Sequence, residues 1–131
     1  MNKDNYASLE AVKRLDEAGI VLETDCYWRI SQFSDSKLID YTPTPSEMEQ
    51  YVGVTIIPAP SMAEVWRELP QRVDDPDDVY ESHTFELTLE KWGYFTSASY
   101  DNYEGQSCKY IECENPIDAL IDLLIWVKKE K

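Results

Sequence analysis

Apolar residues recur at helical spacing in two segments of the chain. In residues 8–18 they fall at intervals of three, and Gly19 follows as a residue that can end a helix in the left-handed conformation. In residues 61–69 the apolar positions build one face, and Ser61 stands three residues before Glu64, which is the spacing of a capping box. The pattern predicts helices over 8–18 and 61–69.

A third helix is predicted at the C-terminal end, where Asn115 is a good N-cap and Pro116 suits the first turn. Its apolar residues occupy most of the circumference, and a narrow stripe is polar: Asp118, Asp122 and Lys129. Such a helix must be covered on more than one side. Either it lies between a sheet and another helix, or Trp126, near the stripe, contacts a second copy in a homodimer.

Twofold alternation replaces the helical period after the middle of the chain. In residues 84–90 apolar and polar side chains alternate, which indicates a strand with one buried face. A turn is expected within residues 91–94, and further strands over 95–100 and 109–112. These segments predict an antiparallel meander.

The first half of the chain carries weaker strand signals. Extended structure is expected over 20–22, 27–30, 37–41 and 54–57, and a short helical turn over 46–51. The predicted order is α-β-β-α-β-β-β-α, with the strand over 54–57 as an addition before the second helix. The fold class is α+β, with helices packed on a largely antiparallel sheet in one domain, residues 1–131.

The charge balance limits the partners. Twelve Lys and Arg against 26 Asp and Glu give a formal charge of −14, which repels nucleic acids and anionic membranes. A basic protein partner is favoured, although high charge also serves solubility alone. The polar start, the absence of a long apolar run and three cysteines without a CxxC pair predict a cytoplasmic protein with reduced thiols.

Motifs for catalysis and for cofactors are weak. No glycine-rich phosphate loop is present, and a histidine-dependent mechanism would rest on the single His83. A zinc site would need ligands from His83 and the scattered cysteines Cys26, Cys108 and Cys113, and the acidic run Asp74 to Glu81 fails the EF-hand pattern. We therefore expect no cofactor, no metal site and no catalytic residue of a familiar type.

Tyrosines and acidic residues provide the best candidate for recognition. Tyr110 lies close in sequence to other tyrosines, and such rings give large contact areas at low entropic cost. The predicted partner-binding residues are Asp74, Asp75, Asp77, Asp78, Tyr94, Tyr100 and Tyr103.

Short motifs spread over the chain carry a family resemblance. They are the opening Ser8-Leu9-Glu10 with Lys13, Leu15 and Gly19, then Ala59-Pro60-Ser61 leading to Trp66, then Asn115-Pro116 with Ala119, Leu120 and Leu123. In these the chain resembles small proteins of bacteriophages and prophages of gut bacteria. The resemblance implies an accessory protein of a mobile element, acting inside a bacterial cell, and it implies no activity.

The leading hypothesis is thus a non-enzymatic protein that binds a basic host or phage protein through an acidic, tyrosine-rich surface. Two alternatives remain open. One is a small hydrolase that uses a pair of carboxylates, which would lie buried in a concave pocket. The other is a DNA mimic, whose acidic face imitates a phosphate backbone and blocks a DNA-binding protein.

Overall fold

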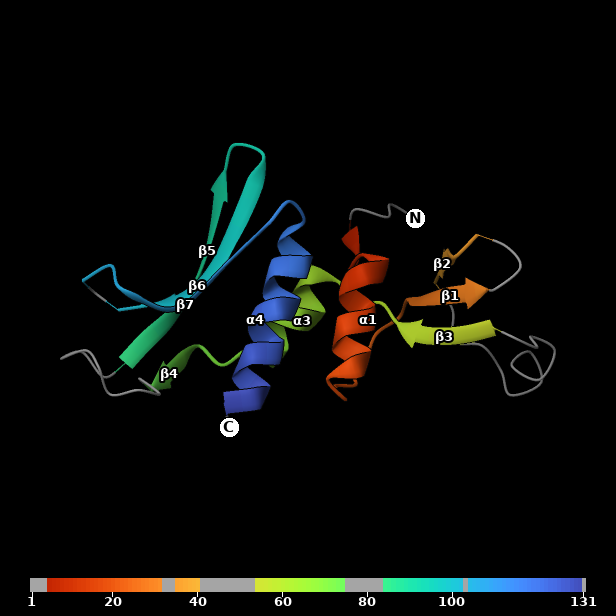
Figure 1. The fold of residues 1–131 in the computed structure, drawn as a ribbon, viewed down its shortest axis with the longest axis horizontal. Helices are drawn as coiled ribbons and strands as arrows, with labels where there is room; N and C mark the ends of the chain where they lie inside the picture. The colour runs from red at the N-terminus through yellow and green to blue at the C-terminus, as the bar shows by residue number, and fades with distance from the viewer. Residues whose placement is uncertain (1–4, 32–34, 41–53, 75–83, 103, 131) are drawn as a thin grey trace.

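Three helices lie side by side in the middle of the molecule (Figure 1). The computed structural model describes residues 5–31, 35–40, 54–74, 84–102 and 104–130. Within them the helices are α1 (Leu9–Glu17), α3 (Met62–Glu68) and α4 (Pro116–Glu130). All three fall where the hydrophobic spacing predicts them.

The described strands form two separate antiparallel sheets. The smaller sheet has the order β2-β1-β3, and the larger has the order β4-β5-β6-β7. The strands of the smaller sheet are β1 (Tyr27–Ser31), β2 (Lys37–Ile39) and β3 (Val54–Pro58). Those of the larger sheet are β4 (Arg72–Asp74), β5 (Thr84–Trp92), β6 (Phe95–Asp101) and β7 (Ser107–Cys113). The predicted α+β class and the order of elements are confirmed.

The sheets flank the helices from opposite sides (Figure 1). On one side α4 packs against β6 and β7 of the larger sheet, and on the other α1 contacts β3 of the smaller one. A single cluster of buried side chains runs through these layers, from Ile57 of β3 through Val12 of α1 to Leu124 of α4 and Phe85 of β5. The helical layer is therefore the common core of both sheets.

Helix α4 is covered on several sides by its own chain. It contacts α1, α3, β6 and β7, and seven of its residues are buried: Ile117, Ala119, Leu120, Ile121, Leu123, Leu124 and Val127. The broad apolar surface of α4 thus reflects the central position of this helix in the fold. None of the described helices is long and apolar enough to cross a membrane.

The polar stripe of α4 ties this helix to α1. Asp118 Oδ1 accepts a hydrogen bond from the Ser8 N–H at 3.0 Å, at the start of α1. Asp122 forms a bidentate ion pair with Arg14, in which its carboxylate oxygens lie 2.8 Å from Nε and 3.2 Å from Nη2. The stripe therefore pairs with the neighbouring helix, which fixes how α1 and α4 lie against each other.

The helix starts follow the predicted capping chemistry. Ser61 accepts a hydrogen bond from the Glu64 N–H, and Glu64 Oε1 accepts one from the Ser61 N–H, so the capping box is complete. Asn115 Oδ1 accepts from the Ile117 N–H at 2.8 Å. Both ends satisfy backbone donors that have no partner inside a helix.

The structure differs from the sequence-based prediction in two places, and a third predicted element falls on residues that the structure does not describe. Residues 20–22 do not form a strand: Leu22 is buried, Val21 is 82% exposed, and neither belongs to a sheet ladder. Strand β4 was not predicted, because three residues are too few for an alternation to be recognised. The expected turn over 46–51 lies outside the described residues.

We expect Glu64→Ala to lower the free energy of unfolding by about 1–3 kcal/mol. Its carboxylate accepts from the Ser61 N–H and from the Thr24 hydroxyl, both at 2.8 Å, so it joins α3 to the segment before β1. Urea denaturation measures the change. Glu68→Ala, at the exposed end of the same helix, should stay within about 0.5 kcal/mol of wild type; an equal loss in both variants would contradict the prediction.

The homodimer through Trp126 stays a prediction, now confined to a small area. The Trp126 ring is half-buried, 6.1 Å from the Tyr100 ring between centroids, and borders a hollow with Ile111 and Ile125. If this area is an interface, Trp126→Glu should give a folded monomer, measured by light scattering and circular dichroism. A wild-type chain that is monomeric at high micromolar concentration would contradict the dimer.

Candidate functional site

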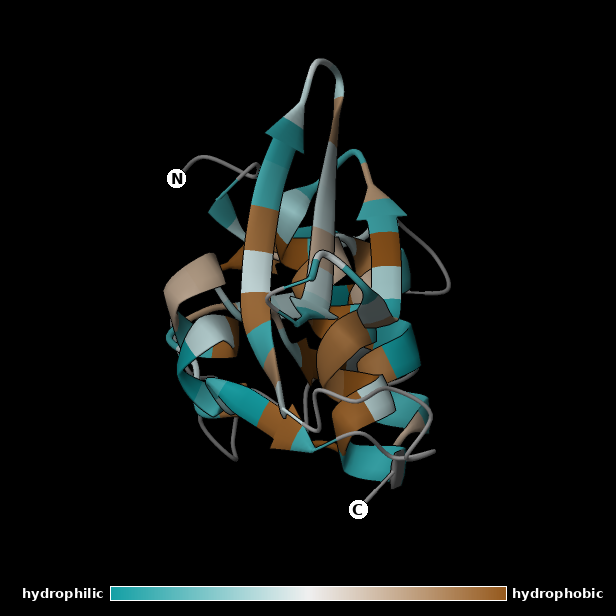
Figure 2. Ribbon diagram, turned by 90° about the vertical axis from the view of Figure 1, so that its left-hand side faces the viewer, coloured by the Kyte–Doolittle hydropathy of each residue, from teal (hydrophilic) through white to brown (hydrophobic). Residues whose placement is uncertain are grey.

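The larger sheet has one covered face and one open face. Along β5, Phe85, Leu87 and Leu89 point toward the helices, while Glu86 and Glu90 point the other way, as the alternation predicts. Figure 2 shows the sheet from its open side, with the helices behind it. Among the described elements no helix covers this face.

The register of the strands brings acidic side chains together on the open face. Glu86 lies directly opposite Asp101, and Ser97 lies between Glu90 on one side and Glu112 on the other. We define the open face by the outward residues Arg72, Asp74, Thr84, Glu86, Thr88, Glu90, Trp92, Phe95, Ser97, Ser99, Asp101, Tyr110 and Glu112. Within that set Arg72 is the one basic residue, so the face is strongly negative.

Like charges opposite each other destabilise a sheet, and the chain offsets this locally. Arg72 Nε lies 3.2 Å from Glu86 Oε1, and the Ser107 hydroxyl donates a short hydrogen bond to Asp101. Glu86 and Arg72 keep 60% and 64% of their side-chain surface exposed. The ion pair is thus solvated, and both groups remain accessible to a partner.

Two of the aromatic side chains on the open face are Trp92, at the hairpin end of β5, and Tyr110, on β7. Trp92 Nε1 donates to Ser97 Oγ at 3.0 Å, and the Tyr110 hydroxyl donates to Glu112 Oε1 at 2.9 Å. Ser97 is only 2% exposed, although it points away from the helices. Both rings keep about half of their surface exposed (Trp92 49%, Tyr110 48%). They therefore combine a fixed position with a free contact surface.

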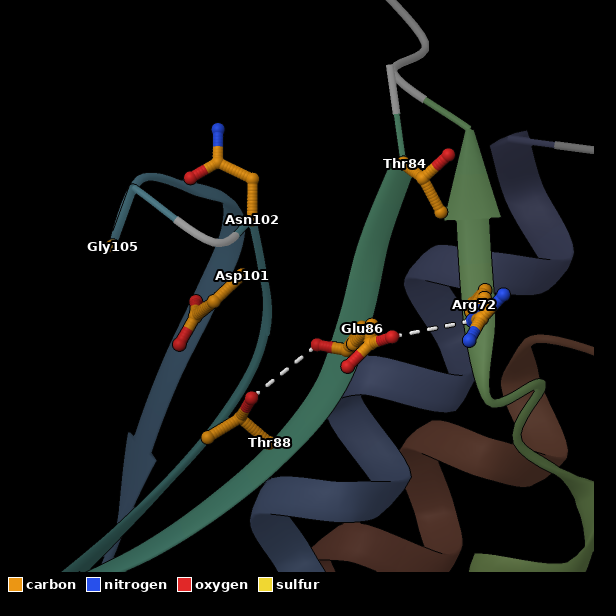
Figure 3. A pocket seen from close by; sticks show the side chains of 7 residues that line it. All are labelled: Arg72, Thr84, Glu86, Thr88, Asp101, Asn102 and Gly105. Carbon is orange, nitrogen blue, oxygen red and sulfur yellow. Dashed lines mark hydrogen bonds and ion pairs between the residues drawn. The ribbon is translucent and has the colours of Figure 1, made fainter. Parts of the chain in front are cut away.

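A hollow of about 590 Å³ opens at one end of this face (Figure 3). Arg72, Glu86 and Thr88 line its floor, with Asp101 across from them on the neighbouring strand. Its rim is the loop that joins β6 to β7, where Asn102 Oδ1 accepts from the backbone N–H groups of residues 104 and 106. This hollow is polar and can accept a positively charged group between two carboxylates.

The hollow does not have the features of a hydrolase site. Two of the described residues that line it are carboxylates, Glu86 and Asp101. Glu86 is largely exposed and already paired with Arg72, whereas a catalytic pair draws its reactivity from burial. Among the described residues no group of three or more His, Cys, Asp and Glu could hold a metal ion. The geometry suits binding better than carboxylate catalysis.

The cysteines take structural positions. Cys26 is buried in the core, and Cys113 lies beside Asp122 with Sγ 4.0 Å from Oδ2. Burial, and then the negative charge of Asp122, raise the pKa of the Cys113 thiol. A raised pKa keeps the thiol protonated and unreactive near neutral pH.

The predicted partner-binding residues are only partly brought together. Asp74 lies on the open face, and Tyr94 is 85% exposed in the turn between β5 and β6. Tyr100 is fully buried, and its hydroxyl donates to the Pro70 carbonyl at 2.7 Å. The prediction that Tyr100 belongs to an exposed surface is therefore wrong. Asp75, Asp77, Asp78 and Tyr103 lie outside the described residues, as does His83, on which a histidine-dependent mechanism would rest.

The predicted set of partner-binding residues did not include Trp92, although Trp92 lies on the open face. One signal was present: Trp92 falls in the even-numbered, outward series of β5, two residues after Glu90.

Comparison with protein-family models, with curated proteins and with solved structures finds no match.

We expect Tyr100→Phe to lower the free energy of unfolding by about 1–2 kcal/mol near neutral pH, because the partly buried Pro70 carbonyl loses its donor. Burial raises the pKa of Tyr100 above its ordinary value near 10. The unfolded chain therefore ionises first as pH rises, and the wild type loses stability above about pH 10. Tyr100→Phe has no hydroxyl to ionise at this position, so its free energy of unfolding should fall less above about pH 10 than that of the wild type.

Denaturant titrations at a series of pH values measure both effects. Tyr94→Phe, on an 85% exposed ring, is the matched control and should behave as wild type. An equal alkaline loss in the wild type and in Tyr100→Phe would contradict the assignment.

Proposed function

We propose that the open face of the larger sheet binds a basic protein, and that the chain is a non-enzymatic accessory protein of a phage or prophage. The observation that carries the binding proposal is the joint placement of acids and aromatic rings on a sheet face that no described helix covers. The phage assignment rests on the sequence resemblance alone.

The chemistry of the face favours protein over other ligands. Its carboxylates repel phosphate groups, so a nucleic acid or an anionic membrane is a poor ligand. Half-exposed Trp92 and Tyr110 offer the flat aromatic area that is enriched in protein interfaces, and arginine side chains stack well on such rings. A partner rich in Lys and Arg would satisfy both the charge and the rings.

Steering by charge adds a kinetic advantage. A chain with a formal charge of −14 attracts a basic protein over a distance, and the attraction weakens as salt rises. We therefore expect fast association that depends strongly on ionic strength.

The test neutralises three acids on the open face: Asp74→Asn, Glu86→Gln and Glu112→Gln in one variant. We expect its association rate with partners captured from a gut-bacterial lysate at low salt to fall roughly tenfold. The matched control neutralises three exposed acids of α1 by Glu10→Gln, Asp16→Asn and Glu17→Gln, which changes net charge equally on another face.

Mass spectrometry identifies the captured proteins, and surface plasmon resonance on the purified ones gives the rates. Equal losses in both variants would mean that net charge alone acts, and would contradict a specific face. If duplex DNA displaces the captured proteins from the wild type, the DNA-mimic alternative explains the binding instead.

A further inference from the structure

Strand β5 continues beyond the end of its neighbour β4. The pairing of the two strands ends where Arg72 faces Glu86, followed by one hydrogen bond from the Leu87 N–H to the Gln71 carbonyl at 2.9 Å. The rest of β5, up to Trp92, has no strand on this side among the described residues. In Figure 1 the β5–β6 hairpin extends past the helices. Half of a nine-residue strand is thus an open edge.

The direction of the backbone groups on this edge follows from Leu87. In an antiparallel ladder, alternate residues direct their N–H and C=O groups to the same neighbour. Since the Leu87 N–H points toward β4, those of Leu89 and Lys91 point to the same side, beyond the last residue of β4. Unpaired groups of this kind are a template for an added strand.

An apolar groove runs beside the open edge on the side of the helices. Met62, Ala63 and Trp66 of α3 line it together with Leu89 of β5, around a volume of about 420 Å³. Met62 and Trp66 stand one helical turn apart and are 38% and 42% exposed. An apolar side chain that faces Leu89 from an added strand would enter this groove.

On the other side the same stretch of β5 carries an acid, Glu90, which points to the open face between Thr88 and Trp92. An added strand would place every second side chain on each side. Its residues should therefore be apolar toward the groove and basic toward Glu90.

We propose that the open edge of β5 binds an extended segment of a partner protein in which apolar and basic residues alternate, added to the sheet as a further strand. This rests on the proposed function, which supplies a basic partner, and it names the form that the partner takes. Addition of a strand is an established mode of peptide recognition. A second copy fits less well, because pairing two β5 edges would bring Glu90 of both copies onto one surface.

The probe is a capped heptapeptide of alternating valine and arginine, added to the full chain. Amide hydrogen exchange followed by NMR should slow for Leu89 and Lys91, by about tenfold when the peptide is at ten times its Kd. Thr88 and Glu90, whose amides point toward β6, should change little. A peptide of the same composition with all valines before all arginines should give no such protection.

Variants in the groove test the apolar half of the proposal. Trp66→Ala and Met62→Gln, at two partly exposed positions, should each weaken binding of the alternating peptide about tenfold, as loss of an interface anchor does. Val21→Ala, at an 82% exposed apolar residue outside the groove, is the control and should leave the Kd unchanged. Circular dichroism verifies that each variant is folded.

Three results would overturn the edge site. One is equal protection by the alternating and the block peptide. The second is protection of Leu89 that grows with protein concentration without peptide, which would make a second copy the occupant. The third is binding that perturbs Tyr110 and Glu112 but not Leu89 or Lys91; the open face would then stand as a binding surface without the edge.

Discussion

The structure depends on covering the apolar surface of α4. A helix of fifteen residues with seven buried side chains cannot lie on a single surface, so the chain supplies the larger sheet on one side and α1 and α3 on the others. Two residues of its polar stripe, Asp118 and Asp122, bond to Ser8 and Arg14 at α1. Because α1 and α3 both pack on α4, no helix among the described residues covers the outer face of the larger sheet, which is the candidate site.

Much of the fold could be predicted because its signals are local. A cap and a hydrophobic stripe lie within a few residues of one another, as Ser61 and Glu64 show, and the alternation of β5 needs no knowledge of its neighbours. The division of the strands into two sheets depends on pairing between distant segments. The local sequence of a single strand does not indicate such pairing. Strand β4 exists only because β5 lies beside it, so no pattern in its three residues could have shown it.

The candidate site could be predicted in kind but not residue by residue. Acids and aromatic residues did indicate a recognition surface, but which tyrosines belong to it depends on the face to which each one points. In β6 the two aromatic residues, Phe95 and Tyr100, have opposite parity, and the residues between them are small. Nothing in that sequence decides which ring turns inward. The structure buries Tyr100 and pairs Phe95 with Trp92 at the outer end of the hairpin.

The strict alternation of β5 also separates two kinds of evolutionary change. Phe85, Leu87 and Leu89 of this strand contact the core, and substitutions there carry the cost of repacking the core. Its even-numbered residues touch solvent, and exchanging Glu86 or Glu90 for other polar residues costs the fold little. One strand can therefore acquire a new partner by changing every second position while the other positions keep the protein folded.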